Sequence, residues 1–148
     1  MAKQILFDEK ARQKFLEEKN VPLPEEYVFH GDYSRRSARL AAEHFLKVKE
    51  RPTAIFAASD DMALELIAAF LEKGIKIPRD ISILGFDDNP ACLYSPVALT
   101  TLRQPLFKMA EDAVRILNAI ISGKNKEKNK IILSPELVIR ESCAAPKE

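Results

Sequence analysis

The stretch from Arg51 to Asp88 constrains the fold more than any other part of the chain. Residues 53–57 are a short apolar and β-branched run, as found in strands that are buried in parallel sheets. A second apolar run, 81–86, follows a segment whose apolar residues repeat with the 3.6-residue period of a helix. A strand, a helix and a strand in this order form a βαβ unit, so the sequence predicts a parallel sheet in an α/β fold.

The ends of the predicted helix are marked by residues that commonly start and stop helices. Asp60 is expected to cap its amino end, with the helix running from about Met62. Lys73 supplies a basic last turn, and Gly74 supplies the left-handed position that follows many helices.

Acidic residues follow both predicted strands of this unit, as Asp60-Asp61 and Asp87-Asp88. The carboxyl ends of parallel strands meet at one edge of a sheet, so we expect these residues and Ser59 to lie close together. In open α/β sheets, ligands bind along that edge.

The acidic pairs admit three interpretations. As helix caps and loop residues they need no function, which accounts well for Asp61 and Asp88. As a general acid and base they would need a closed polar site and a partner, which the sequence does not supply. As acceptors for the hydroxyls of a sugar or the edge of a base they suit their predicted position. Tyr33 follows a further predicted strand at the same edge, where its ring can stack on a sugar or a purine.

The remaining sequence completes a doubly wound parallel sheet with helices on both faces. The further elements are predicted in this order: an edge strand at 5–7, a helix at 8–19, a strand at 27–30, a helix capped by Ser34 and ending near Lys49, an extended segment at 99–102, a helix at 105–122 with Pro105 in its first turn, and a final strand within 131–139 interrupted at Pro135.

Composition is that of a globular domain. The chain has 148 residues, 47% of them hydrophobic and 30% charged, enough for one domain of ordinary size. Its net charge of +1 gives no basic excess of the kind that marks nucleic-acid-binding domains. Cys92 and Cys143 lack CxxC spacing, which favours a reducing compartment without a metal site. The first residues do not form a secretory signal, so the cytoplasm is expected.

Signatures of catalysis are weak. The sequence contains no GxGxxG, GxxxxGK[ST], HExxH or GxSxG motif, so phosphate loops and nucleophile elbows are not expected. Either cysteine with His30 as base is conceivable, but packing of small buried side chains explains the cysteines better. We therefore expect no enzyme activity and no cofactor.

Five phrases carry a family resemblance. They are GDYSRRSA (31–38), RPTAIFAASDDMAL (51–64), GIKIPRDISILGFDD (74–88), LTTLRQP (99–105) and ELVIRES (136–142). Their order and spacing resemble the LacI/GalR family of bacterial transcription repressors over roughly residues 15–142. In that family a helix-turn-helix DNA-binding domain precedes a two-lobed effector domain, which is similar to periplasmic sugar-binding proteins and holds a small effector, usually a sugar, in its cleft.

The resemblance implies a partial effector-binding domain. Residues 1–96 would form the C-terminal lobe, 99–122 a crossover strand and helix of the N-terminal lobe, and 131–142 the closing strand. The helix-turn-helix and most of the N-terminal lobe have no counterpart in this sequence. The wide apolar face of helix 105–122 would then need cover from its own lobe, a second copy or the rest of a longer protein.

The resemblance also assigns site residues. It implies effector contacts from Asp87 and Ser59, a stacking aromatic at Tyr33, and a further ligand-binding position at Asp60, whose other role would be to hold the strand–helix turn. One departure weakens the site. The family's first helix opens R-x-x-G-F, and Asp8 stands at the position of that arginine. Arg12, one turn away, is a candidate substitute.

Two functional hypotheses follow from these observations. The first is a fragment of a LacI/GalR-type regulator that senses a carbohydrate-like effector, weakly by itself, and forms a homodimer. Such a fragment would reach DNA only through the helix-turn-helix it does not contain, and it would not contact a membrane. The alternative is a stand-alone interaction module, either a homodimer or a partner of a full-length relative.

Overall fold

The computed structural model describes residues 2–4, 16, 18, 20–21, 23–123 and 130–145. Within these ranges the strands are β1 (Ala2–Gln4), β2 (Ala54–Phe56), β3 (Ser82–Asp87), β4 (Thr100–Arg103) and β5 (Glu136–Val138). The helices are α2 (Arg35–Lys47), α3 (Asp60–Glu72) and α4 (Leu106–Ile121), with 3-10 turns η1 (Glu25–Tyr27) and η2 (Pro90–Leu93).

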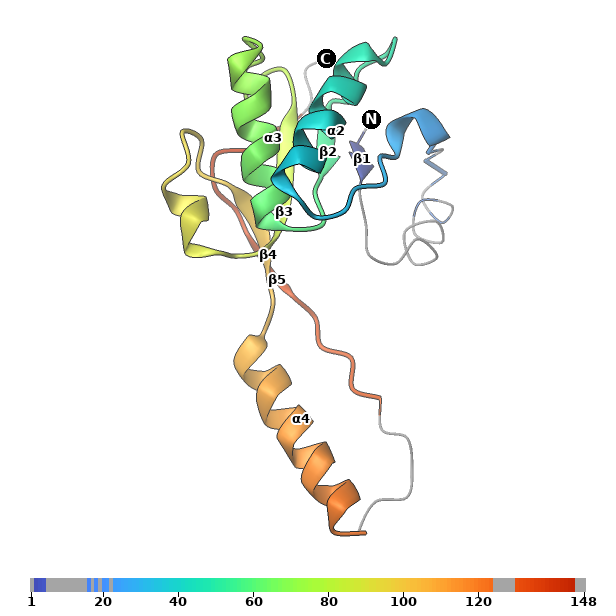
Figure 1. Cartoon of the computed structure of the whole chain (residues 1–148), viewed down its shortest axis with the longest axis vertical. Helices are drawn as coiled ribbons and strands as arrows, with labels where there is room; N and C mark the ends of the chain where they lie inside the picture. Colours follow the sequence, from blue (N-terminus) through green and yellow to red (C-terminus); the bar gives the residue numbers. More distant parts are fainter. Residues whose placement is uncertain are drawn as a thin grey trace.

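The sheet is mixed. Its strands lie in the order β1-β2-β3-β4-β5, with β1 to β4 parallel and β5 antiparallel to β4. The antiparallel strand arises because the chain leaves the sheet through β4 and α4 and then returns beside β4 (Figure 1). The α/β fold predicted from the sequence is confirmed, with one antiparallel edge strand added.

Helices α2 and α3 pack against each other on one face of the sheet (Figure 1). This arrangement follows from the strand order, since right-handed crossovers that advance in one direction place their helices on the same side. The helix expected at 8–19 falls mostly outside the described residues, and the strand expected at 5–7 and the positions of Asp8 and Arg12 lie outside them.

Several predicted boundaries are corrected by the structure. Residues 27–30 are not a strand, because η1 ends at Tyr27 and extended chain follows it. Pro105 is the N-cap of α4 and does not occupy its first turn. The final strand is confined to Glu136–Val138. The cap of α2 was predicted correctly, since the Ser34 side chain accepts a hydrogen bond from the Ser37 N–H.

The core lies between the sheet and the two packed helices. It consists of small and branched side chains, which let α2, α3 and the strands approach closely. Its largest fully buried hydrophobic members are Phe45, Phe70, Ile55, Met62, Leu66, Ile67, Ile83 and Leu99.

Gly85 in β3 marks a close approach inside this core. A Cβ at this position would clash with Oδ1 of Asp60 and would lie 2.8 Å from Cδ2 of Leu99. We expect Gly85→Ala to lower the free energy of unfolding by about 2–3 kcal/mol, the scale of an overpacked core. Urea denaturation measures this change. Gly74→Ala is not a suitable control, because the φ of +74° at Gly74 would strain any side chain placed there. Ala69→Gly, a change inside α3, calibrates the assay instead.

Helix α4 projects away from the rest of the chain (Figure 1). Most of its apolar residues are exposed, and Phe107 reaches 87% exposure. Its one buried residue is Asp112, which pairs with Lys108 and Arg115 along the helix. The exposed apolar face that the sequence suggested for helix 105–122 is therefore present. No helix in the described part of the chain has the length and apolar character needed to cross a membrane.

Candidate functional site

Three of the residues singled out from the sequence lie at or just after the carboxyl ends of strands or extended segments. Ser59 follows β2 as the N-cap of α3, and its hydroxyl oxygen accepts the Met62 N–H at 3.3 Å. Asp87 is the last residue of β3. Tyr33 precedes α2 and is half exposed. The Ser59 hydroxyl can still donate its own proton, because capping uses only its oxygen as an acceptor.

Asp87 has an exposed carboxylate with limited protein contacts. Its Oδ1 accepts a hydrogen bond from Nε2 of Gln104 at 2.7 Å, and its Oδ2 accepts none from the described residues. Partial desolvation raises the pKa of Asp87, the nearby Asp60 and Asp61 charges add to this, and the Gln104 hydrogen bond opposes it. The carboxylate thus has one oxygen available to a donor brought by a ligand.

Backbone strain gathers near this edge of the sheet. Tyr33, Asp87 and Asp88 have φ values of 65°, 123° and 59°, in the region that side chains with a Cβ seldom adopt. Such conformations cost on the order of 1–3 kcal/mol each, and they concentrate at binding and catalytic sites. The positive φ values therefore coincide with two of the residues selected from the sequence, Tyr33 and Asp87, and not with Ser59, whose backbone is extended.

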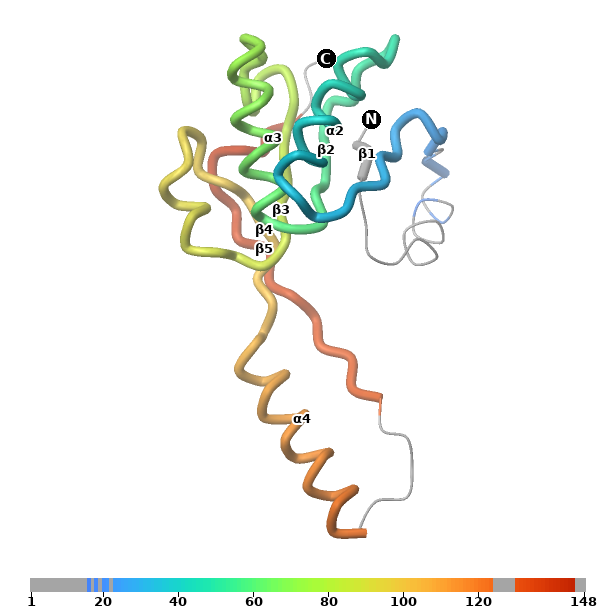
Figure 2. Tube along the Cα trace, viewed as in Figure 1, coloured from blue at the N-terminus to red at the C-terminus, as the bar shows by residue number. Residues whose placement is uncertain are grey.

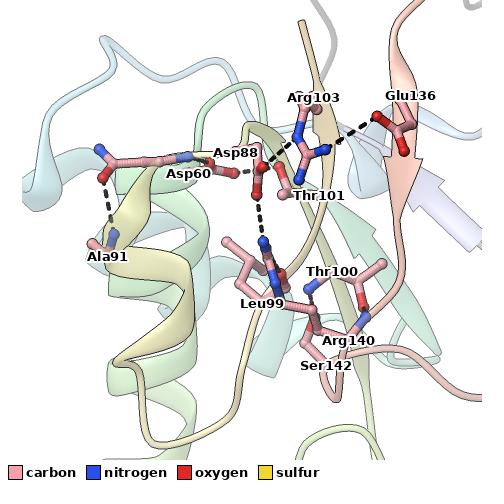
Figure 3. Close-up of polar contacts among 11 residues, drawn as sticks. Asp60, Asp88, Ala91, Leu99, Thr100, Thr101, Arg103, Glu136, Arg140 and Ser142 are labelled. Atoms are coloured by element: carbon pink, nitrogen blue, oxygen red, sulfur yellow. Dashed lines mark hydrogen bonds and ion pairs between the residues drawn. The ribbon is translucent and has the colours of Figure 1, made fainter.

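Asp60 is buried, with only 1% of its surface exposed. Its Oδ2 accepts the Asn89 N–H at 2.6 Å, and its Oδ1 accepts the Thr101 hydroxyl at 2.6 Å (Figure 3). The predicted cap is wrong, because Ser59 caps α3 and Asp60 is the first residue of the helix. The Asp60 carboxylate ties α3 to β4 and to the loop after β3.

Asp88 holds together the two strands that lead to and from α4. Its Oδ2 accepts Nε of Arg103 at 2.6 Å, and its Oδ1 accepts a guanidinium nitrogen of Arg140, also at 2.6 Å (Figure 3). Arg103 also contacts Glu136 on β5, and Arg140 donates to the backbone oxygen of Leu99. We call Asp88, Arg103 and Arg140 the strand clamp. The interpretation of Asp88 from the sequence, as a loop residue that needs no function, is therefore corrected.

The strand clamp is partly shielded from water. The side chains of Asp88 and Arg140 are 11% and 13% exposed. Desolvation alone would raise the pKa of Asp88, but the hydrogen bonds and charges of Arg140 and Arg103 outweigh it and leave the pKa lowered. Asp88 is therefore ionised and fully engaged near neutral pH.

Sequence reasoning missed Gln104, Thr101, Arg103 and Arg140. These residues stand in the phrases LTTLRQP and ELVIRES, which carried the family resemblance without any assigned role. Only the fold shows that the two phrases meet, since β4 and the segment after β5 come together beside Asp88.

Groups for catalysis or metal binding are not assembled in the described residues. No cluster of three or more His, Cys, Asp or Glu side chains that could hold a metal lies among them. Burial, with the nearby Asp60 carboxylate, raises the pKa of Cys92 to about 12, so this thiol stays protonated near neutral pH. His30 pairs with Glu25 at 3.5 Å and not with a cysteine.

Comparison with known proteins identifies the fold family. Residues 6–143 match the family described as the periplasmic binding protein-like domain. Two similar relatives are HTH-type regulators. PurR of Photobacterium profundum is 36% identical over 133 residues, which is 90% of this chain and 40% of that protein. MalR of Clostridium butyricum is 40% identical over 131 residues, which is 88% of this chain and 39% of that protein.

A solved structure agrees with these relatives. A regulatory protein of the LacI family from Chloroflexus aggregans superposes with a TM-score of 0.83 at 29% identity, over 95% of this chain and 54% of that chain. This chain spans less than half the length of the curated relatives it matches. The relatives are transcriptional regulators and not enzymes. The chain belongs to the periplasmic binding protein-like domain family and matches the LacI-family transcriptional regulators within it.

Proposed function

We propose that this chain is the effector-sensing part of a LacI-type transcriptional regulator, and that it recognises a small polyhydroxylated molecule of the sugar class. The observation that carries the proposal is the Asp87 carboxylate, which stands at the carboxyl end of β3 with Oδ2 unused by the described residues. Vicinal hydroxyls are donors that suit such an acceptor.

Ser59 and Tyr33 complete the proposed contact set. The Ser59 hydroxyl can donate to a sugar oxygen while it caps α3, and the half-exposed Tyr33 offers an aromatic surface for stacking. Asp60 is left out of this set. Its two oxygens already accept hydrogen bonds from Asn89 and Thr101, and its buried position gives a ligand no access.

Gln104 is the proposed link between the site and α4. It donates to Asp87 and stands directly before Pro105, the N-cap of α4. A ligand that binds Asp87 would therefore alter a contact at the base of the projecting helix. In a fuller protein, α4 and the segment 131–135 would belong to a second lobe, and closure of the two lobes would report the effector.

Effector affinity is expected to weaken as pH falls through the pKa of Asp87, because protonation turns one acceptor oxygen into a donor. The folded-state pKa of Asp87 is raised from 3.8, so the loss should begin above that value. NMR titration of the ¹⁵N-labelled chain with maltose at pH 7, and then toward about pH 4, tests this. The same titration of Asp87→Asn should show binding that is weak at every pH.

Two outcomes of this titration would count against the proposal. Wild-type binding that does not change with pH would remove the ionised carboxylate from recognition. A marked loss of stability in Asp87→Asn would also count against it. Because the pKa of Asp87 is raised, its ionisation opposes folding as pH rises through that pKa. The Asn variant should therefore be at least as stable at pH 7.

A homodimer formed through α4 is the second candidate, favoured by the exposed apolar face of that helix. We favour cover by the rest of a longer chain, because the curated relatives extend well beyond the matched part. Light scattering over a range of concentrations separates the two. The second candidate would be supported if the wild-type chain formed a dimer, if Leu117→Asp dissociated that dimer, and if Asn118→Asp left it intact.

We assign DNA contact to a part of the regulator that lies outside this sequence. The chain's net charge of +1 offers little for phosphate recognition. Sequence-specific binding of an operator by this chain alone in a gel-shift assay would contradict the assignment. We place the protein in the cytoplasm, where its regulator relatives would meet DNA.

A further inference from the structure

A cavity of about 420 Å³ lies at the amino ends of β2 and β3, at the opposite end of the strands from Asp87. The carboxyl ends of α2 and α3 and the segments that precede β2 and β3 surround it. Figure 2 shows these helix ends on the side of the lobe away from α4. The residues of β3 between the two sites span roughly 17–20 Å. The cavity is therefore separate from the proposed effector site.

The size of the cavity is that of a ligand pocket. The cavity is open to solvent on one side, so it is a surface pocket and not an enclosed packing void. Its volume of about 420 Å³ lies within the range of about 300–1,000 Å³ that is common for pockets that hold small molecules.

The wall of the cavity combines apolar and polar side chains. Its apolar surface comes mainly from the half-buried Leu46, Ile75 and Pro78, because Phe45 and Phe70, which also line it, are only 2% and 1% exposed. Such a wall suits the hydrocarbon or aromatic body of a ligand.

The rim of the cavity carries a surplus of positive charge. Arg51 and Arg79 line it, and both are exposed to solvent. The one acidic lining residue, Asp80, pairs with Arg79 and accepts the Lys76 N–H, so the surplus positive charge at the rim is that of Arg51. Arg51 has no ion-pair partner in the described ranges, which leaves its guanidinium available to an anion.

We propose that this cavity is a second small-molecule site, and that it takes an amphipathic carboxylate. The apolar body would lie against Leu46, Ile75 and Pro78. The carboxylate would meet Arg51, with Arg79, whose Nε already pairs with Asp80, as a second donor. Guanidinium groups bind carboxylates through paired, charge-assisted hydrogen bonds. The site is distinct from the sugar-class site, and its occupancy does not depend on Asp87.

The test uses 4-phenylbutyrate as the probe and its amide, 4-phenylbutanamide, as the uncharged match. Amide shifts of the ¹⁵N-labelled chain are followed during titration with each compound. We expect saturable shifts from 4-phenylbutyrate at the non-proline residues of 51–53 and 75–82, with at least fivefold weaker binding of the amide. Arg51→Gln and Arg79→Gln should each weaken the acid by about fivefold, and Arg36→Gln, on the exposed surface of α2, should not.

A cavity-filling variant tests whether the shifts arise from binding inside the cavity. Ile75→Phe should abolish the shifts at 75–82 while the remaining spectrum keeps the pattern of the folded chain. Equal binding of acid and amide would overturn the proposal, as would shifts outside the cavity or affinity that is unchanged in Arg51→Gln. If the Ile75→Phe chain binds 4-phenylbutyrate as wild type does, the cavity is not the site.

Discussion

Asp60→Ala is expected to lower the free energy of unfolding by about 3 kcal/mol, the scale seen when a buried polar network loses a member. The carboxylate is the common acceptor for the Asn89 N–H and the Thr101 hydroxyl. Its removal leaves two donors without that acceptor in a site that excludes water. Urea denaturation followed by circular dichroism measures the change.

Two further variants show that the acceptor, and not the volume, causes the loss. Asp60→Asn keeps the shape and one acceptor oxygen, so it should lose only about 1–1.5 kcal/mol. Asp61→Ala, the exposed neighbour on α3, should stay within about 0.5 kcal/mol of wild type. If Asp60→Ala were as stable as Asp61→Ala, the hydrogen bonds of Asp60 that connect α3 to β4 would make no contribution to the free energy of unfolding.

Asp88→Ala is expected to destabilise the chain by about 2–3 kcal/mol. The change leaves the poorly exposed Arg140 without its anion, and the loss of one partner of a shielded pair costs far more than a surface pair contributes. The Arg103 contact is lost together with it. Thermal and urea unfolding of the variant and of wild type at pH 7 measure the difference.

The matched control for the strand clamp is Glu136→Ala. This carboxylate pairs with Arg103 at 3.2 Å from an exposed position, so its removal should cost less than about 0.5 kcal/mol. The pH dependence gives a second check. The pKa of Asp88 is lowered in the folded chain, so its contribution is present above the ordinary aspartate pKa and is lost as pH falls through the folded-state pKa. A wild-type advantage over Asp88→Ala that persisted undiminished in strong acid would contradict the clamp.

The central βαβ unit was predictable because its signals are local. An apolar run, a period of 3.6 residues and a glycine stop gave β2, α3 and β3, and the order of strands and helices gave the parallel sheet. The cap of α3 was assigned one residue too late, because Ser59 and Asp60 are both good cap residues in sequence. Burial of the Asp60 carboxylate against β4 decides between them.

The strand clamp could not be predicted from local pattern. Asp88, Arg103 and Arg140 are far apart in sequence, and they meet only because β5 returns beside β4. The strand predicted at 27–30 failed for a related reason. A β-forming composition needs a partner strand, and η1 and extended chain occupy that segment instead. Residue type indicated the edge of the sheet, and long-range pairing determined which acidic residue is available there.

The central claim is that the Asp87 carboxylate receives a sugar-class effector, and paired NMR titrations of wild type, Asp87→Asn and Asp61→Asn test it most directly. Glucose, maltose and cellobiose serve as probes, with hypoxanthine as the base-class alternative. Under the proposed function the described residues supply one side of the effector site, so we expect weak binding, with a Kd of about 1 mM or above, or about −4 kcal/mol. We predict shifts at Asp87, Ser59 and Gln104 for at least one sugar, lost in Asp87→Asn and retained in Asp61→Asn. The absence of these shifts with every sugar, or equal binding by all three chains, would contradict the claim.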